Sequence, residues 1–161
     1  MRVRGTWTQW CGRNESRPTM NEIIRVAYEH DMVFRAEGPG FQIGMDLRGH
    51  PRFSEAGPSP VELLVAAIGG CIGMHVAMFC KKAGLSPGGI RVDLAYTLAE
   101  EDGRRRVSTV YAEVDAPGVP PDLKAAAEEA ARSSILPNTL AHPPVLDVVM
   151  WTGAAERAAV A

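Results

Sequence analysis

The longest apolar stretch of the chain runs from Leu63 to Cys80 and contains no arginine, lysine, aspartate or glutamate. Just before it, Ser59 and Glu62 have the spacing of a capping box, and Pro60 between them suits the first position of a helix. These residues predict that a helix begins at this point. A helix on the surface of a protein would show a polar face, which this segment hardly has.

The end of this helix is marked as clearly as its start. Lys81 and Lys82 place positive charge in the last turn, and Gly84 follows as a residue that readily adopts the left-handed conformation of a helix cap. We therefore predict one helix of about 24 residues, roughly 36 Å long. A helix that is apolar on all sides must be buried in a large core, against a second subunit or in a membrane.

Alternating apolar and polar residues predict strands on both sides of this helix. Asp102-Gly103 is a typical hairpin turn, and a polar loop is expected over residues 48–57. The expected strands are Ile23–Tyr28, Met32–Ala36 and Phe41–Leu47 before the helix, and Ile90–Ala99 and Val107–Val114 after it.

The last third of the chain predicts a second, amphipathic helix over Pro121–Ser133, a loop over Ile135–Pro144 and a final strand over Val145–Trp151. Strands and helices in this order indicate the α+β class, with antiparallel sheet packed on helices. Residues 1–19 have no sustained period and are expected to form a loose extension, with Met20 as an alternative translation start. Residues 20–161 fit a single domain.

Charge and cysteine content exclude several classes of protein. The 17 basic and 19 acidic side chains are balanced, so we expect no nucleic-acid partner. Cys11, Cys71 and Cys80 are too few for a secreted disulfide framework, and no cysteine or histidine spacing predicts a metal site or a cofactor. The N-terminus lacks the apolar region of a secretory signal, which favours a cytoplasmic location.

A membrane-embedded dimer is a third, weaker interpretation of the apolar helix. The uncharged run reaches the lower limit for a membrane span, and Gly69-x-x-x-Gly73 has the spacing found where membrane helices cross. His75 and the ordinary α+β remainder argue against a span. In a soluble protein the same glycines would let a buried helix pack closely on another helix.

Cys71 and His75 are the candidate chemical groups. His75 follows Cys71 by four residues and therefore lies one turn later on nearly the same helix face, whereas Cys80 faces the opposite side. A protonated imidazole beside the thiol would favour the reactive thiolate. Two alternatives stay open: such an activating histidine, or one whose ring is satisfied by a backbone carbonyl or a neighbouring helix.

Two segments carry a resemblance to a known family. The stretch GPSPVELLVAAIGGCIGMHV resembles the helix of the OsmC/Ohr family (osmotically induced protein C and organic hydroperoxide resistance protein), and EEAARSSILPNTLAHPPVLDVV resembles the region of its second cysteine. The likeness spans roughly Asn21 to Met150. It implies the OsmC-like fold, in which antiparallel sheets from two subunits wrap around long central helices in an intertwined homodimer.

The resemblance also implies a chemistry, in which a helix cysteine attacks a peroxide and a second cysteine closes a disulfide. Cys71 matches the attacking cysteine, but the second falls at Ser134, which cannot form a disulfide. The family's catalytic glutamate aligns with Val61, and its arginine aligns with His30-Asp31. The arginines that remain as substitutes are Arg25, Arg35, Arg48 and Arg52.

Two functions follow from these expectations. The first is a thiol-dependent redox protein that reduces organic hydroperoxides through Cys71, with His75 assisting and an external thiol as reductant. The alternative is a non-catalytic homodimer that binds an apolar small molecule near Cys71. Neither function needs a membrane.

Overall fold

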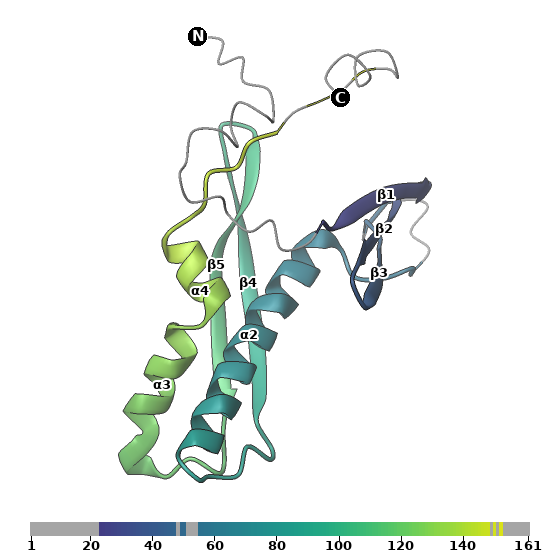
Figure 1. Ribbon diagram of the computed structural model, residues 1–161. Coiled ribbons are helices and arrows are strands. Elements are labelled where there is room, and N and C mark those ends of the chain that lie inside the picture. Colours follow the sequence, from purple (N-terminus) through teal and green to yellow (C-terminus); the bar gives the residue numbers. More distant parts are fainter. Residues whose placement is uncertain (1–22, 48, 51–54, 149, 151, 153–161) are drawn as a thin grey trace, which may run out of the picture.

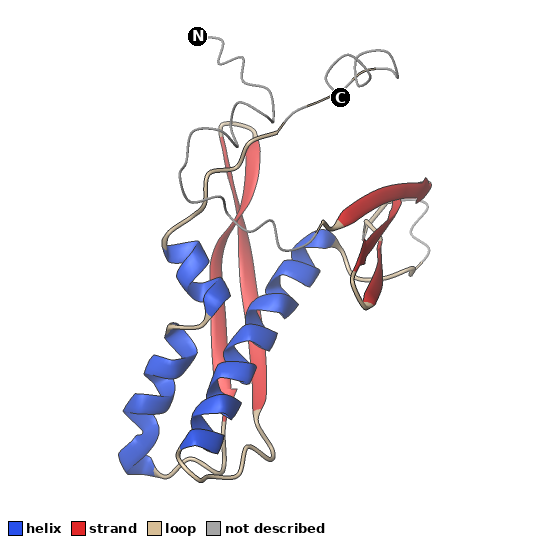
Figure 2. Ribbon diagram, viewed as in Figure 1, coloured by secondary structure: helices blue, strands red, loops and turns tan. Residues whose placement is uncertain are grey.

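The computed structural model describes residues 23–47, 49–50, 55–148, 150 and 152. Along the chain, a small three-stranded sheet is followed by a long helix, a long β-hairpin and two shorter helices (Figure 1). Strands follow one another in groups rather than alternating singly with helices, as the colours of Figure 2 show. This is the α+β class predicted from the sequence. The extension expected over residues 1–19 lies outside the described residues.

The three-stranded sheet consists of β1 (Arg25–His30), β2 (Val33–Gly38) and β3 (Phe41–Met45), all antiparallel and in that order. It confirms the three strands expected before the helix, within a few residues at each end. Because side chains alternate between the two faces of a strand, the register assigns each residue to a face. The apolar face carries Val26, Tyr28, Phe34, Ala36, Phe41, Ile43 and Met45.

Much of this apolar face is open to solvent. Tyr28 and Phe34 meet edge to face with ring centroids 5.6 Å apart, yet Tyr28 remains 61% exposed and Val26 54% exposed. The opposite face carries charged residues, with Arg35 bound to Glu29, and also the buried Val33. A sheet with one polar and one apolar face normally covers the apolar one, and among the described residues this cover is incomplete: Ala36 and Met45 are buried, whereas Val26 and Tyr28 are not.

The central helix α2 (Pro60–Lys82) has the ends that its sequence predicts. Ser59 Oγ accepts a hydrogen bond from the backbone N–H of Glu62, and the Glu62 carboxylate accepts the backbone N–H of Ser59 at 2.8 Å. At the other end Gly84 has φ +72°. A stripe with helical spacing is buried within the chain: Val65, Ile68, Gly69, Ile72, Val76 and Cys80.

The hairpin of β4 (Arg91–Glu101) and β5 (Arg104–Asp115) packs along α2. Its turn is formed by Asp102 and Gly103, both at positive φ, as their sequence predicts. Gly69 lies against Leu94 so closely that a Cβ there would stand 2.3 Å from a Leu94 methyl group. Within this chain, the glycines of α2 therefore admit a strand, rather than the second helix that we expected.

Two shorter helical segments complete the fold. A 3-10 turn, η1 (Pro121–Leu123), leads into α3 (Lys124–Arg132), which packs beside α2 and confirms the predicted amphipathic helix. The loop expected over Ile135–Pro144 is wrong for its first part, which forms α4 (Ile135–Ala141). Pro137 is the third residue of this helix, where the missing backbone N–H breaks no hydrogen bond within the helix.

The strand expected over Val145–Trp151 is also not formed among the described residues, which leave out Val149 and Trp151. Residues 145–148 and 150 have no regular structure, although their sequence pattern is that of a strand. A strand needs a neighbouring strand for its hydrogen bonds, and this segment has none among the described residues. Val145 is 87% exposed and Leu146 is 86% exposed.

Candidate functional site

Two free cysteines lie on α2 in different surroundings. Cys71, near the middle of the helix, is partly exposed, whereas Cys80 has no exposed surface and belongs to the buried stripe. This agrees with the opposite orientations expected from their spacing of nine residues. Only a thiol that solvent can reach is able to meet a dissolved oxidant, so Cys71 is the chemically available one of this pair.

His75 contacts the backbone of Cys71. Its ring Nδ1 lies 3.0 Å from the Cys71 carbonyl oxygen, and because a carbonyl only accepts, Nδ1 carries the hydrogen and donates it. In the neutral ring the lone pair is then on Nε2. The spacing of four residues does bring His75 to Cys71. Of the two alternatives left open by the sequence, the observed hydrogen bond is that of a histidine whose ring is satisfied by a backbone carbonyl.

Ser134 stands where the family resemblance places a second cysteine. The residue is completely buried, and its hydroxyl donates to the Ala131 carbonyl at 2.8 Å. It also begins α4, since its own carbonyl accepts the backbone N–H of Asn138. Ser134 therefore has a structural role at the junction of α3 and α4.

The carboxylate nearest the start of α2 is engaged in capping. Glu62 Oε2 accepts both the backbone N–H of Ser59 and its hydroxyl, at 2.8 and 2.9 Å. Val61, at the position aligned with the family's glutamate, has no ionisable group. The helix start thus supplies a structural carboxylate at Glu62.

Two of the four candidate arginines lie on the polar face of the three-stranded sheet. Arg35 forms a bidentate ion pair with Glu29, in which Nη2 lies 2.9 Å from Oε2. The hydrogen bonds from Arg35 hold the pKa of Glu29 below its usual value. By the strand register, Arg25 shares this face with Arg35. Both point away from the apolar face. Arg48 and Arg52 lie outside the described residues.

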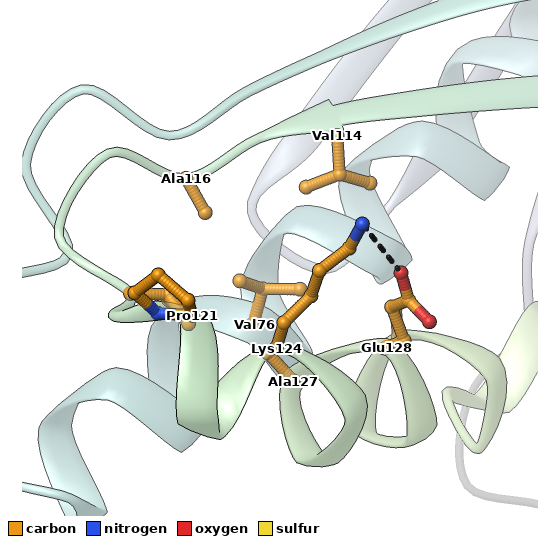
Figure 3. Close-up of a pocket in the computed structure, with 9 residues that line it drawn as sticks. Val76, Val114, Ala116, Pro121, Lys124, Ala127 and Glu128 are labelled. Atoms are coloured by element: carbon orange, nitrogen blue, oxygen red, sulfur yellow. Dashed lines mark ion pairs between the residues drawn. The ribbon is translucent and has the colours of Figure 1, made fainter.

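No group of three or more His, Cys, Asp or Glu side chains in the described part of the chain is placed to hold a metal ion. The described residues do form an apolar hollow of about 330 Å³ between α2, β5 and α3 (Figure 3). Val76 and Val114 line it, and the Lys124 ammonium, 3.7 Å from the Glu128 carboxylate, lies at its edge. Cys71 does not line this hollow.

The sequence profile of the family described as OsmC-like protein matches residues 53–149. The chain belongs to the OsmC-like family. The match includes α2 with Cys71, the hairpin and both later helices, so the recognition made from two sequence segments is confirmed. No curated protein matches the chain in sequence.

Solved structures similar to this chain have the same fold at low sequence identity. A Psychrobacter arcticus protein, provisionally described as an osmotic stress induced and detoxification response protein, has a TM-score of 0.65 at 16% identity, covering 72% of this chain and 85% of its own. An OsmC-like protein of Mycoplasma pneumoniae has a TM-score of 0.63 at 15% identity, covering 78% and 91%. The organic hydroperoxide resistance protein OhrB of Bacillus subtilis has a TM-score of 0.52 at 14% identity, covering 75% and 90%.

Membership of the family also bears on the apolar helix. By length and composition alone α2 could cross a membrane, with a mean hydropathy of 2.1. In this fold it is instead the core helix, packed against β4, β5 and α3. The OsmC-like fold is that of a soluble protein, so the interpretation as a membrane-embedded dimer is not supported.

Proposed function

We propose that the protein is a thiol-dependent redox protein that reduces organic hydroperoxides through Cys71. The observation that carries the proposal is a partly exposed free thiol near the middle of α2, within the segment that matches the OsmC-like family. The likeness to the OhrB structure supports the fold only. The chemistry is argued from the cysteine itself.

In the proposed reaction the Cys71 thiolate attacks the terminal oxygen of a hydroperoxide ROOH. The O–O bond breaks, the alcohol ROH leaves with a proton from solvent, and Cys71 is oxidised to a sulfenic acid. A small thiol R′SH then attacks the sulfenic sulfur and releases water, leaving a mixed disulfide. A second R′SH regenerates the Cys71 thiol and releases R′SSR′.

The external thiol is essential to this proposal because Ser134 has no sulfur. Its buried hydroxyl is bonded to the Ala131 carbonyl and cannot replace a resolving thiol. Cys80 is completely buried on the other side of α2. A dissolved thiol is therefore the proposed partner that completes the cycle and protects Cys71 from further oxidation.

A homodimer is part of the proposal, supported by the apolar surfaces that one chain leaves uncovered. Met74 on α2 is 66% exposed, and the apolar face of the three-stranded sheet is exposed as well. Isolated apolar side chains on a surface need no explanation, but a helix flank and a sheet face together favour an interface. We place this dimer in the cytoplasm, where thiols stay reduced.

The alternative function, a non-catalytic dimer that binds an apolar small molecule near Cys71, has weaker support. Two hollows beside α2 are lined by other residues of this helix, Val76 in one and Ile72 in the other. A ligand in either hollow would not touch the thiol. This alternative requires that Cys71 reacts slowly with alkylating reagents and that the wild type consumes no peroxide.

Consumption of cumene hydroperoxide in the presence of a small thiol tests the proposal. The wild type is expected to consume the peroxide with matching oxidation of the thiol, and Cys71→Ser is expected to lose the activity, because a hydroxyl is not nucleophilic enough to replace the thiolate. Cys80→Ala is the matched control and should keep most of the rate. Equal rates for wild type and Cys71→Ser would end the proposal.

A further inference from the structure

The exposed flank of α2 offers very few polar atoms to a neighbour. Its residues are spaced three or four apart and therefore lie on one side of the helix: Leu64, Ala67, Cys71, Met74 and Met78. Apart from the methionines, the only side chains with a heteroatom over residues 63–80 are Cys71, His75 and Cys80, and Cys80 is completely buried. A surface that covers this flank can thus make polar contacts only with the Cys71 sulfur or the His75 ring.

The apolar face of the three-stranded sheet carries a single hydroxyl group, that of Tyr28. The strand register pairs Tyr28 with Phe34 on this face, whereas His30 pairs with Val33 and belongs to the other face. The Tyr28 ring meets the Phe34 ring edge to face, and its hydroxyl has no hydrogen-bond partner among the described residues. Water can satisfy this hydroxyl while it is exposed, but a buried tyrosine needs a partner within the protein.

The sheet face and the helix flank complement each other between two copies of the chain rather than within one. Neither surface carries a charged side chain, and an apolar sheet face is normally covered. In one chain the sheet stands beside the first residues of α2, apart from the middle of the helix where Cys71 lies (Figure 1). In a twofold-symmetric dimer, the sheet of each copy can cover the flank of the other, and the contact is made twice.

Burial of Tyr28 on the flank of a second copy decides where its hydroxyl bonds. The backbone carbonyls of α2 already accept hydrogen bonds within the helix, and the carbonyl of Cys71 also accepts one from His75. A thiolate accepts a stronger hydrogen bond than the neutral His75 ring, and a protonated ring accepts none. The Cys71 thiolate is therefore the favoured acceptor for the Tyr28 hydroxyl.

We propose that Tyr28 of the partner subunit is a further catalytic residue, whose hydroxyl donates a hydrogen bond to the Cys71 thiolate. The bond favours the ionised form of the thiol, which is the form that attacks a peroxide. This inference rests on the homodimer of the proposed function and adds a residue that the second copy contributes to the site. A single chain then holds only part of each reactive centre.

Tyr28→Phe tests the hydroxyl, because phenylalanine keeps the apolar ring and removes only the donor. Alkylation of Cys71 by iodoacetamide at neutral pH, followed by mass spectrometry of the Cys71 peptide, is expected to slow about threefold or more, since a hydrogen bond to a charged group is lost. Tyr111→Phe is the matched control. Tyr111 is as exposed as Tyr28 but lies on β5, opposite Ala95, and its substitution should leave the rate unchanged.

Mixed dimers of two differently tagged chains test whether the hydroxyl comes from the partner. In the first mixture one chain carries Tyr28→Phe and the other carries Cys71→Ser, so the remaining Cys71 faces an intact Tyr28 and should alkylate at the wild-type rate. In the second mixture one chain is wild type and the other carries both substitutions, so Cys71 faces phenylalanine and should react slowly. Both mixtures contain the same substitutions, and a general effect on stability would therefore be equal in the two.

Each outcome decides the inference. Fast alkylation in the first mixture and slow alkylation in the second support it. Equal rates in the two mixtures, the opposite order, a Tyr28→Phe homodimer as fast as wild type, or a wild type that sediments as a monomer would each overturn it. Peroxide consumption is measured separately, so reactivity that depends on Tyr28 without turnover rejects only the redox function, and turnover that is indifferent to Tyr28 rejects only this inference.

Discussion

At the scale of single residues, the hydrogen bond between His75 and the carbonyl of Cys71 determines which ring nitrogen is available for chemistry. Nδ1 donates to the carbonyl, and this anchors the ring one turn from the thiol. A proton taken up by Nε2 would place a positive charge near the sulfur without breaking that bond. We therefore propose that His75, if protonated, acts on Cys71 through its charge, as a positioning residue.

His75→Gln is predicted to slow the alkylation of Cys71 in mildly acidic solution. Glutamine retains a donor for the Cys71 carbonyl but cannot become positively charged, so the thiolate loses its electrostatic support. The loss should reach about tenfold at most, equivalent to about 1.4 kcal/mol. Iodoacetamide rates measured across pH would show the two proteins converging in alkaline solution, where imidazole side chains in general carry no charge. Identical alkylation rates at every pH would show that His75 does not affect the reactivity of the Cys71 thiol.

The residues around the cysteine show what the sequence could and could not predict. The spacing of four residues correctly brought His75 to Cys71, because helix geometry is local. The role of Arg35 was open until the strand register placed it on the polar face beside Glu29. Contacts between distant segments depend on register and packing, which a single sequence does not contain.

At the scale of elements, α2 packs against the hairpin and against α3. The closest approach is at Gly69, where the helix backbone meets the side chain of Leu94 on β4. Glycine at the middle of a helix costs about 1 kcal/mol relative to alanine. Here the absence of a side chain lets the strand approach, which offsets that cost.

Gly69→Ala is predicted to lower the free energy of unfolding by about 1–3 kcal/mol, because the added methyl group displaces the Leu94 side chain. Urea denaturation of the wild type and the variant measures this. In a Leu94→Ala background the obstructing methyl groups are gone. In that background, Gly69→Ala should leave the free energy of unfolding unchanged or raise it by at most about 1 kcal/mol, because alanine has the higher helix propensity. An equal loss in both backgrounds would contradict the described contact.

Element boundaries were predictable where a local signal marks them. The capping box at Ser59 and the Asp102-Gly103 turn are such signals, and both occur as predicted. α4 was predicted as a loop; its seven residues include Pro137, which the first turn of a helix tolerates. The final strand was predicted but is not formed among the described residues. Its pattern is present, but no neighbouring strand pairs with it there.

At the scale of the whole molecule, the chain leaves apolar surface uncovered on three elements. The exposed flank of α2, the apolar face of the three-stranded sheet and the segment after α4 all lack cover among the described residues (Figure 1). One such surface alone needs no explanation, but the three together support the proposed homodimer. The fold class was predictable from element order, whereas the assembly rests on these surfaces.

Met74→Asp is predicted to weaken the homodimer at least about tenfold, because it places a charge on the exposed flank of α2 where an apolar side chain would be buried. Met74→Leu keeps the apolar character and should leave the association almost unchanged. Sedimentation equilibrium on the three proteins gives the dissociation constants. A wild type that sediments as a monomer at micromolar concentration would contradict the proposed assembly.

The open face of the three-stranded sheet has a thermodynamic consequence. In the proposed homodimer, burial of Val26, Tyr28 and their neighbours would favour the native state only when two polypeptides meet, so that part of the driving force would be bimolecular. Folding and association would then be coupled steps, and dilution would destabilise the sheet because it favours dissociation. The melting temperature of such a protein is a property of its concentration as much as of its sequence.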